Sequence, residues 1–328
     1  MEPMYALIKD FPDQLLRASA LCKHWTFEKI ERPKGVVICG MGGSGIAGKI
    51  VSSAFADQLS VPVTVVQDYQ LPEFCSQESL VIVSSYSGNT EESISCFLDA
   101  VQRGCRPVCI SSGGKLLDLC LKYQCPCLTI PGGFPPRSQF GYGFIGILHI
   151  LSSYGLITKG APDSVDEYAK KLLAMQVEIS AAAAELAEKL KDKIVCMYAE
   201  VRYAMVALRW RQQLNENSKM LCLCEAVPEM NHNELVGWGA ANSTYAAVLI
   251  HSSPMHPRIK KRFEILQGVL TARTPYVLDV QCPSGSPLFT VLYLVHFGDW
   301  LSWHLAEQRG FDPVAIPQID YLKEEMGR

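Results

Sequence analysis

Short apolar runs alternate with stretches of helical spacing along the first half of the chain. The runs are rich in β-branched residues, which is typical of strands covered on both faces of a sheet. The predicted strands are residues 36–39, 61–66, 80–84, 107–110 and 127–130. Helices are predicted within residues 5–31 and at 46–55, 92–103, 116–123 and 140–154. Strands alternating with helices of about ten residues indicate a parallel sheet with right-handed crossovers.

The second half of the chain repeats this pattern after a predicted linker at residues 155–163. A long helical stretch at 164–191 leads into predicted strands at 194–198, 246–251 and 275–279. Helices are predicted at 201–215, 259–267 and 288–309. We therefore predict an α/β protein of two domains, residues 1–155 and 156–328, each a parallel, flavodoxin-like sheet flanked by helices.

Composition narrows the possible partners. The 328 residues are 48% hydrophobic and 19% charged, with a net charge of −3, as in ordinary globular proteins. No basic stripe with interleaved aromatic residues indicates nucleic-acid binding. No run of 18 apolar residues is present, and the first five residues do not resemble a signal peptide. We expect a cytoplasmic protein that binds neither nucleic acid nor membrane.

The 13 cysteines favour free thiols over a metal site or a disulfide framework. Several lie in apolar strand-like runs, and the pairs Cys125/Cys127 and Cys222/Cys224 are too isolated for metal-ligand spacing. Buried thiols in a reducing compartment behave as small apolar residues. We therefore predict no metal site.

A glycine turn at residues 40–45, Gly-Met-Gly-Gly-Ser-Gly, follows the first predicted strand and precedes a helix. Glycine lets a ligand approach the backbone closely, and the positive end of the following helix favours a phosphate. The turn matches the G-x-G-x-x-G motif, and Asp68 after the second strand could bind a ribose. One interpretation is therefore that the glycine turn binds a dinucleotide.

A second polar turn favours a different ligand. Ser85, Ser87 and Thr90 follow the third predicted strand, where they surround Gly88. Carboxyl ends of parallel strands gather at one sheet edge, so this loop can face Gly43 and Ser44 of the glycine turn. Hydroxyl and backbone N–H groups together suit a phosphate monoester. The alternative is a simple turn with a helix N-cap.

These two turns resemble those of sugar-isomerase (SIS) domains. Three further segments resemble the bifunctional phosphoglucose/phosphomannose isomerase family, from about residue 35 to Lys323. They are Phe-Pro-Pro-Arg at 134–137, Asn-Glu-Asn-Ser-Lys at 215–219 and Pro-Glu-Met-Asn-His-Asn-Glu at 228–234. The resemblance implies two SIS domains, a soluble homodimer, and isomerisation of glucose and fructose 6-phosphates in glycolysis or gluconeogenesis, without a cofactor.

An aldose–ketose isomerase needs a carboxylate base, groups that open the sugar ring and a cation near the enediolate. The resemblance makes Glu216 the base and His232, supplied by the partner subunit, the ring-opening acid. It also makes Arg137 the enediolate-stabilising cation and Lys323 an assistant in ring opening. From the residues alone, these would be a solvated carboxylate at the end of a helix, a loop histidine between two amides that could fix its tautomer, and two surface cations.

Three other functions stay open at this point. A non-catalytic phosphosugar sensor would keep the phosphate loops without catalytic groups, and a dehydrogenase would bind a nicotinamide dinucleotide. An amino-sugar isomerase would need ammonia or a glutaminase domain, which the sequence does not display. Residues 312–317, Asp-Pro-Val-Ala-Ile-Pro, lack the threonine frequent in bifunctional members. The resemblance therefore implies the glucose reaction and leaves the mannose reaction open.

Overall fold

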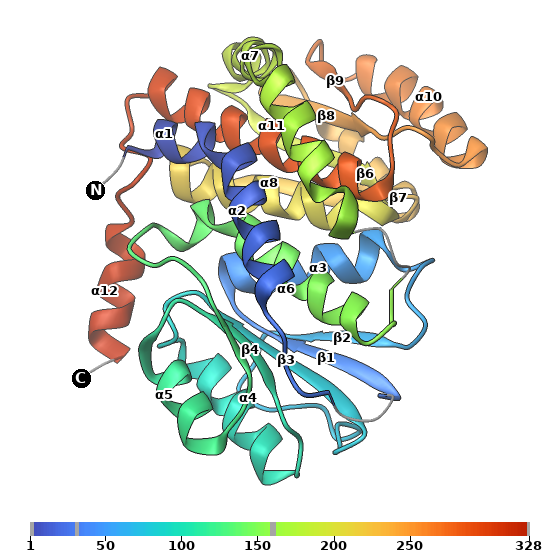
Figure 1. Cartoon of the computed structure of the whole chain (residues 1–328). Helices are drawn as coiled ribbons and strands as arrows, with labels where there is room; N and C mark the ends of the chain where they lie inside the picture. The colour runs from blue at the N-terminus through green and yellow to red at the C-terminus, as the bar shows by residue number, and fades with distance from the viewer. Residues whose placement is uncertain (1–2, 30–32, 158–161, 327–328) are drawn as a thin grey trace. The chain divides into compact units, whose positions relative to one another are not determined.

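The computed structural model describes residues 3–29, 33–157 and 162–326, which form two compact units (Figure 1). Unit 1 consists of Asp10–Ala174 and Pro287–Val291. Unit 2 consists of residues 3–9, Met175–Ser286 and residues 292–326. Each unit contains one parallel sheet flanked by helices, so the predicted fold class is confirmed. The predicted domain division after residue 155 stays a prediction, and linker residues 158–161 lie outside the described residues.

The sheet of unit 1 has five parallel strands in the order β2-β1-β3-β4-β5. They are β1 (Gly35–Cys39), β2 (Val63–Val66), β3 (Ser79–Ser85), β4 (Val108–Ser111) and β5 (Cys127–Thr129). This is the flavodoxin-like order, in which the chain reverses direction across the sheet between β1 and β3. All seven residues of β3 are buried, as its continuous apolar run predicts.

Helices cover both faces of this sheet (Figure 1). One face carries α4 (Glu91–Gln102) and α5 (Gly114–Tyr123), and the other carries α2 (Phe11–His24), α3 (Gly42–Ala54) and α6 (Phe140–Ser153). Helix α6 is apolar nearly all round and lies buried between α2, α3 and the sheet. A short 3₁₀ helix, η1 (Pro136–Ser138), precedes it.

The sheet of unit 2 has four parallel strands in the order β7-β6-β8-β9. They are β6 (Ile194–Glu200), β7 (Cys222–Val227), β8 (Tyr245–His251) and β9 (Val277–Gln281). Its helices include α1 (Met4–Lys9), α8 (Ala204–Ser218), α10 (Pro257–Thr271) and α12 (Pro317–Met326). Helices α7 (Val165–Leu190) and α11 (Pro287–Gln308) each begin in unit 1 and end in unit 2. Within the described ranges, no helix is both long and apolar enough to span a membrane.

Strand β7 is absent from the sequence-based prediction, and the helix whose surface was expected to carry Lys323, α12, was predicted without bounds. Strand β7 lies at the sheet edge, where only Cys222 and Val227 are fully buried, so its sequence shows no continuous apolar run. No residue of α12 is buried, and it therefore shows no strong apolar stripe. Helix α8 was predicted to end at residue 215, but it continues to Ser218.

Buried polar side chains join α8 to α11 within unit 2. The Arg209 guanidinium donates to both oxygens of Asp299 at 2.8 Å, and Gln213 donates to the same carboxylate at 2.6 Å. All three side chains are almost fully buried. Because a buried charge is costly without a partner, this arrangement fixes the two helices in one register.

His296 is a buried titratable group on α11. Its Nε2 accepts a hydrogen bond from the Trp300 indole N–H at 3.2 Å, so the ring is neutral. Burial lowers the pKa of His296 to about 3. The unfolded chain binds a proton here below about pH 6.5, whereas the folded chain does not until about pH 3. This histidine therefore lowers the stability as the pH falls through that window.

We predict that acid destabilises the protein partly through His296. Between pH 7.5 and pH 5, its neutral ring should cost about 2 kcal/mol of unfolding free energy. In His296→Gln, the amide oxygen can still accept from Trp300, so this part of the pH dependence should disappear. Urea denaturation of both proteins at the two pH values measures the difference. The exposed-site variant His24→Gln serves as the control and should keep the wild-type pH dependence.

Candidate functional site

The glycine turn and the serine-rich turn lie at neighbouring strand ends in unit 1. Strand β1 ends at Cys39 before the turn that opens α3, and β3 ends at Ser85 before the turn that opens α4. The two strands pair in parallel, so both turns emerge at the same edge of the sheet. This edge is the point where the chain reverses direction, at which ligands bind in open α/β sheets.

Close backbone packing and one hydrogen bond join these turns. The backbone N–H of Tyr86 donates to the Ser44 hydroxyl at 3.2 Å. A methyl group on Gly40 would lie 2.8 Å from the carbonyl oxygen of Ser84, so only glycine fits there. The two turns thus form one polar surface at the start of α3.

The hydroxyls of the serine-rich turn have distinct environments. Ser85 is buried and donates to the Thr90 hydroxyl at 3.1 Å, whereas Ser87 is exposed and accepts from the Asn89 N–H at 3.2 Å. Thr90 precedes the first residue of α4, but its side chain makes no cap hydrogen bond. Thr90 is thus the N-cap residue of α4 by position, without the side-chain hydrogen bond that a cap usually makes. Gly88 has a φ of +70°, and a methyl group there would collide with Gly113.

The helix ends differ in charge. Helix α4 carries Glu91 and Glu92 in its first turn, which compensate the positive end of its dipole. Helix α3 has no acidic residue in its first turn, and its first N–H groups belong to Gly42, Gly43 and Ser44. The start of α3 is therefore the better anion site of the two.

Tyr86 connects four loops of unit 1. Besides the bond to Ser44, its carbonyl oxygen accepts from the N–H and the hydroxyl of Ser112, at 3.0 and 2.6 Å. Its phenolic oxygen accepts from the N–H of Phe134 at 3.1 Å. Burial raises the pKa of this phenol, so it stays protonated. The sequence analysis assigned Tyr86 no role.

Arg137 lies next to the glycine turn. It is the central residue of η1, and the exposed fraction of the residue is only 4%. A methyl group on Gly43 would lie 3.3 Å from the carbonyl oxygen of Pro136 and 3.5 Å from Cα of Arg137. The structure thus brings Arg137 beside the glycine turn, at a buried position and not at the surface position expected from its sequence context.

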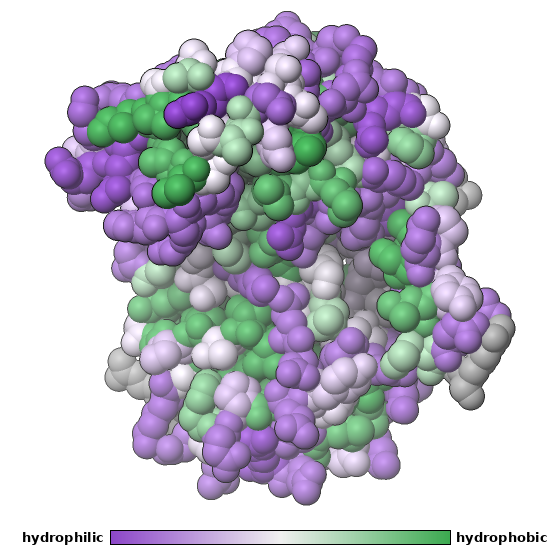
Figure 2. All heavy atoms as spheres, turned by 180° about the vertical axis from the view of Figure 1, so that it is seen from behind, coloured by the Kyte–Doolittle hydropathy of each residue, from purple (hydrophilic) through white to green (hydrophobic). Residues whose placement is uncertain are grey.

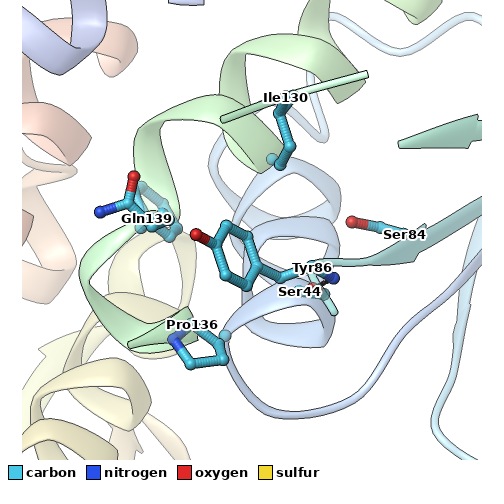
Figure 3. Close-up of a pocket in the computed structure, with 9 residues that line it drawn as sticks. Ser44, Ser84, Tyr86, Ile130, Pro136 and Gln139 are labelled. Carbon is cyan, nitrogen blue, oxygen red and sulfur yellow. Dashed lines mark hydrogen bonds between the residues drawn. The ribbon is translucent and has the colours of Figure 1, made fainter. Parts of the chain in front are cut away.

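A small pocket lies between the glycine turn and the start of α6 (Figure 3). Tyr86 lies across it, with its hydroxyl pointing toward Gln139. The pocket is lined by Gly43, Ser44, Ser84, Tyr86, Ile130, Pro136, Gln139, Phe140 and Gly143. Its volume is about 10 Å³, roughly that of one water-sized probe, so it does not hold a sugar phosphate by itself.

Glu216 lies in unit 2, in the last turn of α8. The prediction that it follows the helix is wrong, because Asn217 and Ser218 continue the helix as buried residues. Glu216 itself is partly exposed. The flanking burial fixes the direction in which its side chain leaves the helix.

His232 ends the 3₁₀ helix η4 (Glu229–His232), where a loop was predicted, and its side chain is exposed. The prediction that flanking amides fix its tautomer is not supported by their contacts. Asn231 accepts from Arg262 at 3.1 Å, and Asn233 donates to Glu229 at 2.9 Å. Two contacts hold the following helix α9 (Glu234–Gly237). The buried Tyr198 hydroxyl donates to Glu234 and accepts from the Trp238 indole at 2.8 Å.

Lys323 lies on α12 and is exposed. No hydrogen bond or ion pair within the described part of the chain joins Lys323, His232 and Glu216 to one another. The structure therefore places these three residues on separate elements of unit 2: α12, η4 and α8. In the residues that the structure describes, no cluster of three or more His, Cys, Asp or Glu side chains is arranged to hold a metal ion.

Known proteins that are similar to this chain in sequence have the names of phosphosugar isomerases. A family model described as the bacterial phospho-glucose isomerase C-terminal SIS domain matches residues 179–326. The bifunctional phosphoglucose/phosphomannose isomerase of Aquifex aeolicus is 34% identical over 99% of both chains. The protein of that name from Caldicellulosiruptor bescii is 32% identical over 98% of both.

Solved structures share the fold at lower identity. The tagatose-6-phosphate ketose/aldose isomerase from Escherichia coli has a TM-score of 0.76 and 14% sequence identity, covering 94% of each chain. Identity this low bears on the fold alone. It agrees with the two parallel sheets flanked by helices.

We predict that Tyr86→Phe weakens sugar-phosphate binding as well as folding. The loss of one hydrogen bond to Phe134 should cost about 1 kcal/mol of stability. Because the same bond holds the loop before Arg137, the Kd for glucose 6-phosphate should rise roughly fivefold, or about 1 kcal/mol. Titration calorimetry and urea denaturation measure the two effects.

Tyr142→Phe is the matched control for this prediction. The Tyr142 hydroxyl, on α6, accepts from Arg17 at 3.2 Å and, among the described residues, makes no hydrogen bond to the loop before Arg137. It should lose similar stability and keep wild-type affinity. An equal change of Kd in both variants would remove Tyr86 from the positioning of the site.

Proposed function

The chain belongs to the bifunctional phosphoglucose/phosphomannose isomerase family, and we propose that it interconverts glucose 6-phosphate, fructose 6-phosphate and mannose 6-phosphate. One observation supports the proposal above all: the hydrogen bond from Tyr86 to Ser44 joins the glycine turn to the serine-rich turn. The chain that contains this pair of turns is 34% identical to the isomerase of Aquifex aeolicus. The relatives reported above have enzyme names, which favours catalysis over a non-catalytic phosphosugar sensor.

The turns at the start of α3 and α4 would hold the phosphate. The backbone N–H of Gly43 and the hydroxyl of Ser44 supply donors at the uncompensated helix end. The hydroxyls of Ser85, Ser87 and Thr90 supply the rest of the hydrogen bonds. This arrangement binds a phosphate through N–H and O–H donors and leaves Arg137 for the reacting end of the sugar.

Ring opening comes first in the proposed reaction. His232 donates a proton to the ring oxygen as the C1–O5 bond breaks, and the C1 hydroxyl loses its proton to water. The Lys323 ammonium assists by stabilising the C1 oxygen as that proton leaves. The product is the open-chain aldehyde with its C2 proton made acidic by the neighbouring carbonyl. Both side chains are exposed in the structure, as groups that must reach a substrate are.

Proton transfer then moves the carbonyl from C1 to C2. Glu216 removes the C2 proton, which leaves an enediolate with negative charge on its oxygens. The buried Arg137 guanidinium stabilises that charge electrostatically. Glu216 returns the proton to C1, and the proton of the O2 hydroxyl moves to O1, which leaves the carbonyl at C2 and gives the ketose. If the proton is removed from one face of C2 and returned to the opposite face, the reaction interconverts the glucose and mannose epimers.

The protein is also proposed to act as a cytoplasmic homodimer in glycolysis or gluconeogenesis, with His232 supplied by the partner subunit. Unit 2 exposes apolar side chains that a partner could cover, including Leu221 at 87%, Val236 at 81% and Ile265 at 53% exposure. Figure 2 shows the molecule from behind, with hydrophobic side chains gathered at its upper left. This corresponds to the upper right of Figure 1, where α10 lies. Such exposed apolar surface is typical of interaction sites.

We predict that wild-type enzyme turns over glucose 6-phosphate and that Glu216→Gln does not. The amide cannot accept the C2 proton, so kcat should fall by about 10³-fold or more while sugar-phosphate binding remains. Coupled assays with glucose, mannose and glucosamine 6-phosphates, together with deuterium exchange at C2, measure these effects.

Glu188→Gln, at an exposed position on α7, is the control and should keep wild-type turnover. Binding without turnover by the wild type would support the sensor. Turnover of glucosamine 6-phosphate alone would support the amino-sugar alternative. Retained exchange at C2 in Glu216→Gln would remove this residue from the base role.

We also predict that two inactive variants restore activity when mixed. If His232 comes from the partner, a heterodimer of Glu216→Gln and His232→Ala chains contains one intact site. Random pairing should then recover about a quarter of wild-type activity. Unfolding and refolding the two variants together, followed by assay, measures it. Two sites built within single chains would stay inactive in the mixture.

A further inference from the structure

The end of α8, which carries Glu216, is anchored on α11 by buried polar side chains. Asn217 and Ser218 have no exposed surface. The Asn217 amide donates to the Ser302 hydroxyl at 2.9 Å, and the Ser218 hydroxyl donates to the Ser302 carbonyl oxygen at 2.6 Å. Two neighbouring residues thus hold the helix end at one position on α11.

Cations cap the last carbonyl groups of α8. The ammonium of Lys219 donates to the carbonyl oxygens of Glu216 at 2.7 Å and Asn217 at 3.4 Å. Arg309 donates to the carbonyl oxygen of Ser218 at 2.6 Å. Carbonyls at a helix C-terminus have no partner within the helix, and positive charge there is stabilising.

Lys219 occupies a backbone conformation that a lysine adopts at a cost. Its φ is +52°, in the left-handed region, where glycine usually ends a helix. A residue with a Cβ pays about 1 kcal/mol or more for this conformation. Glycine would therefore end the helix at least as well, and the lysine side chain must contribute through its contacts.

One of those contacts reaches the segment that leads to α12. The Lys219 ammonium donates to the carbonyl oxygen of Asp312 at 2.6 Å. The Asp312 carboxylate in turn accepts from the N–H of Val314 at 2.7 Å, which shapes the chain just before α12 begins at Pro317. The Lys219 ammonium thus joins the end of α8, which carries Glu216, to the segment that precedes α12, which carries Lys323.

We propose that Lys219 is a positioning residue for the isomerase reaction, which holds Glu216 and the segment before α12 in one arrangement. The inference rests on the proposed function. In this proposal, Lys219 acts through backbone carbonyl groups and not on the substrate itself. Its loss should therefore lower kcat and leave KM largely unchanged, because the phosphate is held by the turns of unit 1.

The test is Lys219→Gly, which removes the ammonium and relieves the backbone. Its melting temperature should stay close to that of wild type, because relief of the left-handed backbone conformation offsets the lost ammonium contacts. Its kcat with fructose 6-phosphate should fall about tenfold to a hundredfold, as displaced catalytic groups cause. Lys219→Arg keeps a donor in reach and should recover part of the rate. Lys191→Gly, at the end of α7, is the control and should keep wild-type kcat.

A wild-type kcat in Lys219→Gly would overturn the proposal, as would an equal loss in Lys191→Gly. Hydrogen exchange separates this result from a failure of the proposed function. Amides of residues 311–320 should exchange faster in Lys219→Gly than in wild type, whether or not the protein is an isomerase. Unchanged exchange would overturn the tie to Asp312, and absence of turnover in wild type would overturn the function alone.

Discussion

The parallel pairing of β1 with β3 is the constraint on which the rest of unit 1 depends. Because the two strands run the same way at the point where the sheet order reverses, their following turns emerge side by side. Helix α3 then starts at that edge with no acidic residue to cancel its positive end. Tyr86 ties the turn after β3 to Ser44, Ser112 and Phe134, so one residue transmits the geometry of the sheet to the loop before Arg137.

Unit 2 achieves precision by a different physical route. Its groups proposed for catalysis lie at helix ends and in short 3₁₀ turns, so the sheet alone does not fix them. Buried polar contacts position these groups instead. Only a few geometries of such a contact leave no buried donor or acceptor unpaired, so the contact holds its two elements in one arrangement. The Arg209–Asp299 pair sets the register of α8 on α11, and Asn217 with Ser302 sets the position of its last turn.

The central strands were predictable because burial on both faces imposes a continuous apolar run. Strand β7 was not, because the sheet edge leaves its middle residues half-exposed and removes that pattern. The proximity of Gly43 and Ser44 to the serine-rich turn was also predictable, because the carboxyl ends of parallel strands lie at one edge of the sheet. The tie through Tyr86 was not, since a backbone N–H that bonds a side chain leaves no trace in residue type. An aromatic residue between two serines, just after a buried strand, was the available signal.

The bond between Tyr86 and Ser44 also fixes the polarity of the glycine turn. A hydroxyl that accepts from a backbone N–H directs its own hydrogen away from that donor. Ser44 therefore meets an incoming group as a donor, alongside the N–H groups of the helix start. The Ser44 oxygen keeps one lone pair, but the N–H groups of the helix start can only donate, so an oxyanion would find more partners there than an ammonium would. The direction of these hydrogen bonds, in addition to the helix dipole, therefore favours an oxyanion.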